Sequence, residues 1–251
     1  MRSLPGNTMS ISVIYPAYNE EKNLVSTIER SLQALQSLTG DFEIVIINDA
    51  STDATGRIAD EFAVRCRHIR VVHQPRNMGQ GVGIITGFRA ASKELLIHNG
   101  VDYPFDVADL KSMLPLLPNA DIVVAVRKGR PGYTTYRKLL SVATVRLIQT
   151  FFDLRLRDYS FVQLYRRQVW QDIDVDARST GFLIPEALIR AHDLGYRLAE
   201  VDIEYHARMH GKATAGKPSI VARSLLDLLR FWSKRLVRKT PRKPVGEYAR
   251  S

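Results

Sequence analysis

The feature of this sequence that most constrains its fold is the alternation of short apolar runs with amphipathic stretches through the first half. This alternation predicts an α/β protein with a mainly parallel sheet and helices on both faces. Ligands of such sheets bind outside the carboxyl ends of the strands, so we expect functional residues in the loops that follow them. The predicted strands are 11–15, 42–47, 69–73, 94–98 and 121–126, and the predicted helices between them are 20–38, 53–65 and 80–92.

The second half of the chain is less regular and ends in a clean helical pattern. Apolar residues predict helices at 136–152 and 182–194 and a strand at 197–205. From 219 to 238, apolar residues recur at helical spacing, and basic residues repeat that spacing on roughly the opposite face. Such a helix either lies flat on an anionic membrane or packs its apolar stripe against the domain. The stripe consists of Val221, Leu225, Leu228, Leu229, Trp232 and Leu236.

Composition is that of an ordinary globular protein. The 251 residues are 45% hydrophobic and 25% charged, which suits one domain or two small ones and excludes disordered, collagen-like and disulfide-stapled classes. The single cysteine, Cys66, has no partner for an internal disulfide and predicts a reducing compartment. No apolar run reaches the roughly 18–20 residues of a membrane span, and residues 1–9 lack the apolar core of a signal peptide. We therefore expect a protein of the cytoplasmic side.

The positive charge is concentrated at the end of the chain. The net charge is +10, and residues 223–251 contain nine basic against two acidic side chains. A basic end predicts phosphate-bearing partners, namely an anionic membrane surface, a nucleic acid or a nucleotide, although it also fits a solvated tail that aids solubility. Specific nucleic-acid binding ranks last, because the chain contains no recognised module with interleaved aromatic residues.

Two polar loops after the first two strands predict a nucleotide pocket. Tyr18 offers a flat face to a base, and Glu20 accepts hydrogen bonds while favouring the start of a helix. Asp49 is placed to accept from a ribose hydroxyl or a base N–H. Each loop alone also fits a helix cap, with Thr52 or Asp53 as the N-cap of the second helix. Their position at adjacent strand ends favours the nucleotide pocket.

A glycine-rich segment opens the third predicted helix. Gly79, Gly81 and Gly83 allow backbone N–H groups to approach a phosphate, which the positive end of the helix also attracts. The spacing is not the dinucleotide-binding fingerprint, and a tight strand-to-helix turn explains it equally well.

Together these segments resemble the family 2 glycosyltransferases of GT-A fold. The resemblance rests on SVIYPAYNEE at 12–21, INDASTDAT at 47–55 and NMGQG at 77–81, and it continues through 195–201 and 208–212. It is nearest to the dolichol-phosphate mannose synthase-like enzymes, which transfer a sugar from a nucleotide donor to a polyprenyl phosphate.

The resemblance implies how the chain is divided. It covers about residues 10–215 and implies a GT-A (Rossmann-like) domain over 1–215. Within that domain it implies a nucleotide-binding half at 10–127 and an acceptor half at 128–215. A basic amphipathic helix and tail follow at 216–251.

The resemblance also implies roles for individual side chains. Residues after the first strand surround the base and ribose, and the arginines face phosphates, which their planar fork binds in bidentate fashion. Glu186 matches a carboxylate that faces the transfer site in relatives, and Asp102 and Arg208 are implied as catalytic. The implied donor-binding residues are Pro16, Ala17, Tyr18, Glu20, Asp49, Gly81, Gly100, Val101, Arg127 and Lys212.

The sequence departs from the family in its metal motif. The family's Asp-x-Asp, which binds the divalent cation, falls on Gly100-Val101-Asp102, so only Asp102 remains as a ligand. One carboxylate still suits Mg²⁺ or Mn²⁺, because Mg²⁺ takes much of its shell from water and phosphate oxygens. The family's nearby Gln is Pro104, and a Lys frequent in the last motif falls near Thr214, close to Lys212.

The implied reaction is attack of an acceptor oxygen on the anomeric carbon of a UDP- or GDP-sugar, with inversion. A lipid-phosphate acceptor is already anionic and needs no strong base, whereas a sugar hydroxyl needs one, for which Asp158 and Glu186 are candidates. Membrane attachment would be peripheral or through a membrane-protein partner, and a homo-oligomer is also compatible. The alternatives are a soluble or protein-bound acceptor and a nucleotide-sugar-binding protein without transferase activity.

Overall fold

One mixed sheet organises the chain. The computed structural model describes residues 9–129, 133–177, 179, 181–206 and 218–237. Within them the strands are β1 (Ser10–Ala17), β2 (Asp41–Asn48), β3 (Ile69–His73), β4 (Leu95–His98), β5 (Ile122–Lys128), β6 (Gln163–Arg166) and β7 (Leu198–Glu204). They form a seven-stranded sheet in the order β3-β2-β1-β4-β6-β5-β7. Only β6, among these strands, runs antiparallel to its neighbours, β4 and β5.

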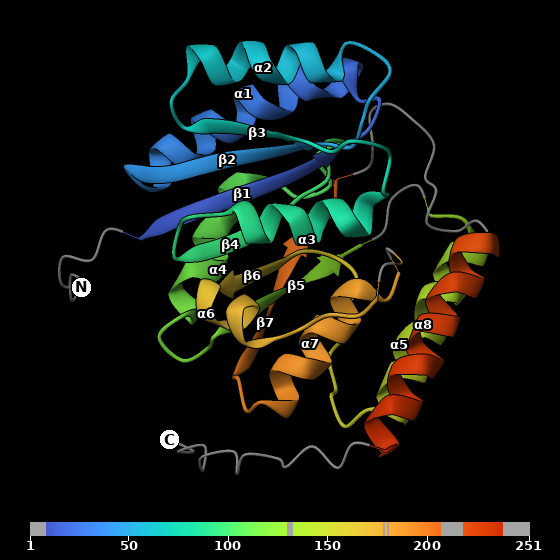
Figure 1. The fold of residues 1–251 in the computed structure, drawn as a ribbon. Coiled ribbons are helices and arrows are strands. Elements are labelled where there is room, and N and C mark those ends of the chain that lie inside the picture. Colours follow the sequence, from blue (N-terminus) through green and yellow to red (C-terminus); the bar gives the residue numbers. More distant parts are fainter. Residues whose placement is uncertain (1–8, 130–132, 178, 180, 207–217, 238–251) are drawn as a thin grey trace.

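Helices cover both faces of the sheet (Figure 1). On one face lie α1 (Glu21–Leu38) and α2 (Thr55–Arg65), and on the other α3 (Gln80–Ala90) and α7 (Leu183–Asp193). The short elements are η1 (Val107–Asp109), α4 (Leu110–Met113), η2 (Leu114–Leu116) and α6 (Arg167–Asp172). The remaining helices are α5 (Thr135–Phe151) and α8 (Pro218–Val237).

The central strands are buried on both faces, which explains their unbroken apolar runs. Because successive strand residues point to opposite sides, Val13 of β1 packs in the core under α1 and α2, while Ile14 packs in the core under α3 and α7. The chain winds outward from β1 through β2 and β3, and then returns to β4 on the other side of β1. The carboxyl ends of β1 and β4 therefore form the switch point at which ligands bind in sheets of this type.

The predicted α/β fold is confirmed, and every predicted strand and helix is present with bounds shifted by at most two residues. The sequence did not reveal β6, because its four residues are too few to show a pattern. The predicted N-cap of the second helix is wrong by one or two positions: the helix begins at Thr55 and its N-cap is Ala54. Asp53 still contributes, because its Oδ1 accepts from the Thr55 N–H at 2.9 Å.

Helices α5 and α8 lie side by side at one end of the molecule (Figure 1). The Phe151 and Trp232 rings are 4.9 Å apart between centroids, and those of Phe152 and Phe231 are 5.5 Å apart. The stripe predicted on 219–238 is thus divided between two environments. Its core side, with Leu228, is buried, whereas Leu225, Leu229 and Leu236 are exposed, as is the neighbouring Leu226. Among the described residues, no helix combines the length and apolarity needed to cross a bilayer.

Candidate active site

The loops after β1 and β2 are fastened to each other at the carboxyl edge of the sheet. The Asn19 side-chain Oδ1 accepts from the Thr52 N–H at 2.8 Å, and the Asn19 backbone N–H donates to Ser51 Oγ at 3.1 Å. The Glu20 N–H donates to Thr55 Oγ1 at 2.8 Å. These contacts cross from one loop to the other over more than thirty positions of sequence, so the two polar loops form one rigid rim.

Asp49 joins this rim to the start of α3. Its carboxylate is 3% exposed, and its two oxygens accept from the backbone N–H groups of Met78 at 2.7 Å and Gly79 at 2.8 Å. Gly79 is the N-cap of α3 and has φ 86°, a conformation that costs other residues free energy. Each carboxylate oxygen has a second lone pair, so Asp49 keeps capacity to accept from a ligand. Gly81 follows in the first turn of the same helix.

The predicted base-binding residues line the end of β1. Ala17 is buried and its carbonyl accepts from the Asp49 N–H at 2.9 Å, while Tyr18 is 45% exposed and presents its ring at the rim. Glu20 accepts from the Asn23 side chain at 2.7 Å, which holds it at the start of α1. Pro16, Ala17, Tyr18, Glu20, Asp49 and Gly81 are therefore brought to one edge, as the sequence predicted for a nucleotide pocket.

The loops after β1, β2 and β4 each contain one non-glycine residue whose backbone is in the left-handed region. These are Asn19 at φ 54°, Ala50 at φ 55° and Tyr103 at φ 54°. Such residues cost roughly 1–3 kcal/mol each and cluster at sites where the surrounding structure holds a loop in place for function. The three lie after β1, β2 and β4, which are neighbours in the sheet.

The loop after β4 carries the altered metal motif. Thr27 of α1 donates to the Val101 carbonyl at 2.5 Å, which ties this loop to the same rim. A Cβ at Gly100 would lie 2.3 Å from Asp102 Oδ1, so the Asp102 carboxylate fills the space in which a side chain at position 100 would begin. No cluster of three or more metal-ligating side chains occurs in the part of the chain that the structure describes. The arrangement fits a Mg²⁺-like cation that takes one protein carboxylate and draws its other ligands from donor phosphate and water.

His98, the last residue of β4, lies directly before this loop and is nearly buried. Burial lowers the pKa of its imidazole to about 4, so His98 is neutral at pH 7. Its Nδ1 has no hydrogen-bond partner among the described residues. His98 is therefore an uncharged, buried side chain directly before the loop that carries Asp102.

Arg127, which was expected to face a phosphate, is engaged within the fold. Its Nε and one terminal nitrogen donate to the two oxygens of Asp158 at 2.6 and 2.8 Å, and its other terminal nitrogen donates to the Tyr133 hydroxyl at 2.6 Å. The side chains of Arg127 and Asp158 are 8% and 2% exposed. Burial alone would lower the pKa of Arg127, but the bonds to Asp158 outweigh it and raise the pKa above its usual value.

Glu186 is likewise used inside the protein. It is fully buried in α7, and its carboxylate accepts from the N–H groups of Asp176 and Ala177 at 3.0 and 2.7 Å. Arg190 Nε also donates to it at 2.7 Å. The carboxylate thus ties α7 to the segment before it. The other two predicted residues, Arg208 and Lys212, lie outside the described residues.

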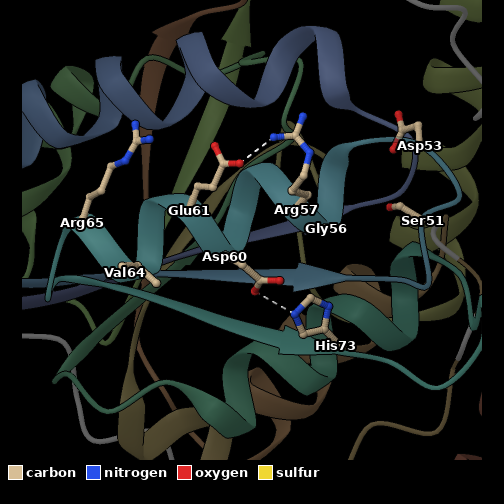
Figure 2. Close-up of a pocket in the computed structure, with 9 residues that line it drawn as sticks. All are labelled: Ser51, Asp53, Gly56, Arg57, Asp60, Glu61, Val64, Arg65 and His73. Atoms are coloured by element: carbon tan, nitrogen blue, oxygen red, sulfur yellow. Dashed lines mark hydrogen bonds and ion pairs between the residues drawn. The ribbon is translucent and has the colours of Figure 1, made fainter.

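A hollow of about 670 Å³ lies elsewhere, against the outer side of α2 (Figure 2). Four of its charged side chains form two pairs: Arg57 with Glu61 at 2.5 Å, and Asp60 with His73 at 2.9 Å. None of the predicted donor-binding residues lines it. The rim at the carboxyl edge is therefore the better candidate site.

The switch point, the acidic residue at the end of β2 and the carboxylate after β4 agree with the GT-A fold that the sequence resemblance predicts. Comparison with known proteins agrees: residues 12–174 match the family described as "Glycosyl transferase family 2". The chain belongs to this family and is a glycosyltransferase.

Relatives with assigned functions act on lipid phosphates according to their names. The chain is 28% identical to dodecaprenyl-phosphate galacturonate synthase of Rhizobium johnstonii, over 90% of this chain and 67% of that one. It is 27% identical to undecaprenyl-phosphate mannosyltransferase of Micrococcus luteus, over 89% of this chain and 94% of that one. The chain thus spans about two thirds of the first relative and nearly all of the second.

Solved structures support the fold. Glucosyl-3-phosphoglycerate synthase from Mycobacterium tuberculosis, determined with Mn²⁺, UDP and glucosyl-3-phosphoglycerate, superimposes with a TM-score of 0.70. The superposition covers 93% of this chain and 87% of that one at 19% identity, a level at which the likeness extends to the fold alone.

Proposed function

We propose that this glycosyltransferase moves a sugar from a UDP- or GDP-sugar to a polyprenyl phosphate at a membrane surface. The observation that carries the proposal is the rim at the switch point, where Tyr18, Asp49, the α3 N-terminus and Asp102 gather at one edge. An aromatic face and a carboxylate suit a nucleoside, and the positive end of a helix suits a diphosphate. The polyprenyl-phosphate specificity named in the two relatives supports the acceptor class.

The state of the two candidate bases favours a lipid-phosphate acceptor over a sugar hydroxyl. Asp158 is bound to Arg127, and Glu186 to two backbone N–H groups and Arg190. Neither carboxylate is placed to take a proton from an incoming hydroxyl without breaking these bonds. A phosphate acceptor is already ionised at pH 7, so its oxygen attacks the anomeric carbon without a base.

Asp102 is the residue that would hold a divalent cation. When bound, the cation would neutralise the charge that develops on the departing diphosphate. The N-terminus of α3 lies at the same edge. The positive end of its dipole, of which Asp49 neutralises a part, favours negative charge there. The family resemblance also implies phosphate-binding roles for Arg208 and Lys212, which lie outside the described residues.

The exposed face of α5 and α8 is a candidate for membrane contact. Tyr136, Leu139 and Val142 on α5 are 55–66% exposed, and Leu226 and Leu236 on α8 are 53% and 63% exposed. Basic side chains accompany them on both helices, so an apolar surface is flanked by positive charge. This combination suits the interface of an anionic bilayer. We therefore propose this face of α5 and α8 as the site of peripheral membrane attachment.

The transfer itself is tested with the full chain, a labelled UDP- or GDP-sugar, Mg²⁺ and undecaprenyl phosphate in detergent. We expect label in the lipid fraction and an equal amount of nucleoside diphosphate. Asp102→Asn should lower turnover at least about tenfold, the scale of one lost charge contact in a transition state. Asp60→Asn, on the outer side of α2, is the matched control. Unlabelled lipid with every donor would refute the proposal, and full activity of Asp102→Asn would remove that residue from the mechanism.

Membrane contact is tested by sedimentation with vesicles of phosphatidylcholine alone or mixed with phosphatidylglycerol. Leu226→Asp should weaken binding to the mixed vesicles about tenfold, because burying a leucine is worth about 1.5–3 kcal/mol. Val64→Asp is the control, since Val64 is 88% exposed and its helix, α2, lies far from α8 (Figure 1). Equal binding of both variants would contradict the assignment of this face.

A further inference from the structure

Gln74 has a buried amide without a hydrogen-bond partner at the proposed nucleotide pocket. It is the first residue after β3 and is 7% exposed. Its backbone N–H donates to the Asn48 carbonyl at 2.9 Å, which fixes the main chain at the end of β2. Its side-chain Nε2, however, has no partner among the described residues. A buried donor left unpaired costs about 1–3 kcal/mol, so its retention calls for an explanation.

The amide lies between α3 and Pro16, one of the residues implied to bind the base. A Cβ at Gly83, in the first turns of α3, would lie 3.1 Å from Pro16 Cβ, 3.7 Å from Gln74 Nε2 and 3.9 Å from Ile47 Cγ2. The Gln74 amide therefore sits between α3 and the ends of β1 and β2. Asp49, two residues after Ile47, binds the N-terminus of the same helix. The acceptor on Asp49 and the unused donor on Gln74 thus both lie against the N-terminal part of α3.

This pair of groups complements only some bases. Uracil has an N–H beside a carbonyl, and guanine has the same pair at N1 and O6. Cytosine and adenine have a ring nitrogen that accepts, beside an amino group that donates. A carboxylate that accepts and an amide N–H that donates therefore match uracil or guanine, and mismatch cytosine and adenine. A mismatch leaves buried polar groups facing each other unpaired, which is the strongest source of discrimination.

We propose that Gln74 is a specificity-determining residue of the donor site, whose Nε2 donates to the base carbonyl while Asp49 accepts from the adjacent base N–H. The inference rests on the proposed function and deepens it: it names Gln74 as the residue that recognises the uracil or guanine of the donor. Binding of the base supplies the acceptor that Nε2 lacks. The residue contacts the base and takes no part in the chemistry at the sugar.

The test measures binding of UDP, GDP, CDP and ADP to the full chain by calorimetry, with Mg²⁺ present. The wild type should bind UDP or GDP at least about a hundredfold more tightly than CDP and ADP. Gln74→Leu, which keeps the volume and removes the donor, should weaken that preferred nucleotide about tenfold and leave CDP and ADP unchanged. Gln36→Leu, on the exposed side of α1, is the matched control and should behave as the wild type.

Thermal unfolding separates a binding defect from a folding defect. Gln74→Leu removes a buried unpaired group, so its melting temperature should equal or exceed that of the wild type. The role of Gln74 would be overturned if Gln74→Leu bound UDP or GDP as tightly as the wild type, or if the wild type bound all four nucleotides equally. Either result would leave the proposed function standing. Wild-type protein that binds no nucleoside diphosphate would overturn both.

Discussion

Replacing Asp158 by Asn tests the interpretation of Arg127 as a residue held inside the fold. The two side chains are almost fully buried and joined by two charge-assisted hydrogen bonds at 2.6 and 2.8 Å. Asn keeps the shape of Asp but has one acceptor oxygen, and its amide group would face the guanidinium with donor against donor. The variant therefore leaves Arg127 charged, buried and incompletely paired.

The expected cost follows from this burial. Removing one partner of a buried ion pair typically destabilises by 3–5 kcal/mol, and because Asn keeps one hydrogen bond we expect about 3 kcal/mol. The neighbouring pair, Lys128 with Glu204 at 3.4 Å, has side chains that are 69% and 62% exposed. Glu204→Gln is thus a matched control, because it removes the partner of Lys128, the residue next to Arg127. Its expected cost is below about 1 kcal/mol.

The assay is urea unfolding of the full chain, followed by the fluorescence of Trp170 and Trp232 and, separately, by circular dichroism. The free energy of unfolding of Asp158→Asn should fall well below that of Glu204→Gln. An Arg127→Met, Asp158→Leu double variant should regain part of the loss, because it removes both charges together. Equal costs for Asp158→Asn and Glu204→Gln would refute the reasoning and return Arg127 to the set of free phosphate ligands.

Three further predictions follow from single residues. Burial lowers the pKa of His98 from its ordinary value of 6.5 to about 4, so the unfolded state binds the proton more readily and stability falls as pH drops from about 6.5 to 4. In urea unfolding across this range, His98→Leu should flatten that fall, and an unchanged slope would contradict the prediction. Burial opposes ionisation of Glu43, but hydrogen bonds from Ser12 and Ser92 outweigh it and lower its pKa below 4.5. This stabilisation is present above pH 4.5 and is lost as pH falls through the lowered pKa. The loss in free energy of unfolding caused by Glu43→Gln should therefore be large at pH 7 and shrink towards pH 3, whereas a constant loss would exclude the charge as its cause. Tyr18→Ala should weaken nucleotide binding with little change in melting temperature, because the ring is 45% exposed; a loss of turnover with unchanged binding would argue against stacking on the base.

The sequence was sufficient for the parts of the fold that local patterns determine. Apolar runs and helix periodicity located the parallel strands and their helices, because these signals lie within windows of five to twenty residues. The rule that parallel sheets bind ligands at strand ends then led to Tyr18 and Asp49. The strand β6 escaped detection because four residues carry too little periodicity.

The remaining features depend on contacts between distant parts of the chain. Arg127 and Asp158 are 31 positions apart, and no local signal pairs them. Asp53 lies one residue before the N-cap of α2, and its second oxygen accepts from the N–H of Glu21 at the start of α1, a contact that no local pattern reveals. Gln74 was overlooked although it directly follows a predicted strand, since its importance lies in a donor that only three-dimensional packing leaves unpaired.

The most direct test of the central claim, a nucleotide pocket at the switch point of the sheet, is hydrogen exchange by mass spectrometry with and without saturating UDP or GDP and Mg²⁺. We expect slower exchange in three segments, at 16–23, 49–55 and 76–83, together with the loop at 99–103. Ser51 and Asp53 belong both to the second segment and to the hollow against α2. The hollow is therefore monitored at residues 56–65 and at His73, where exchange should be unaffected. Protection confined to that hollow, with none at the carboxyl edge of β1, β2 and β4, would contradict the account.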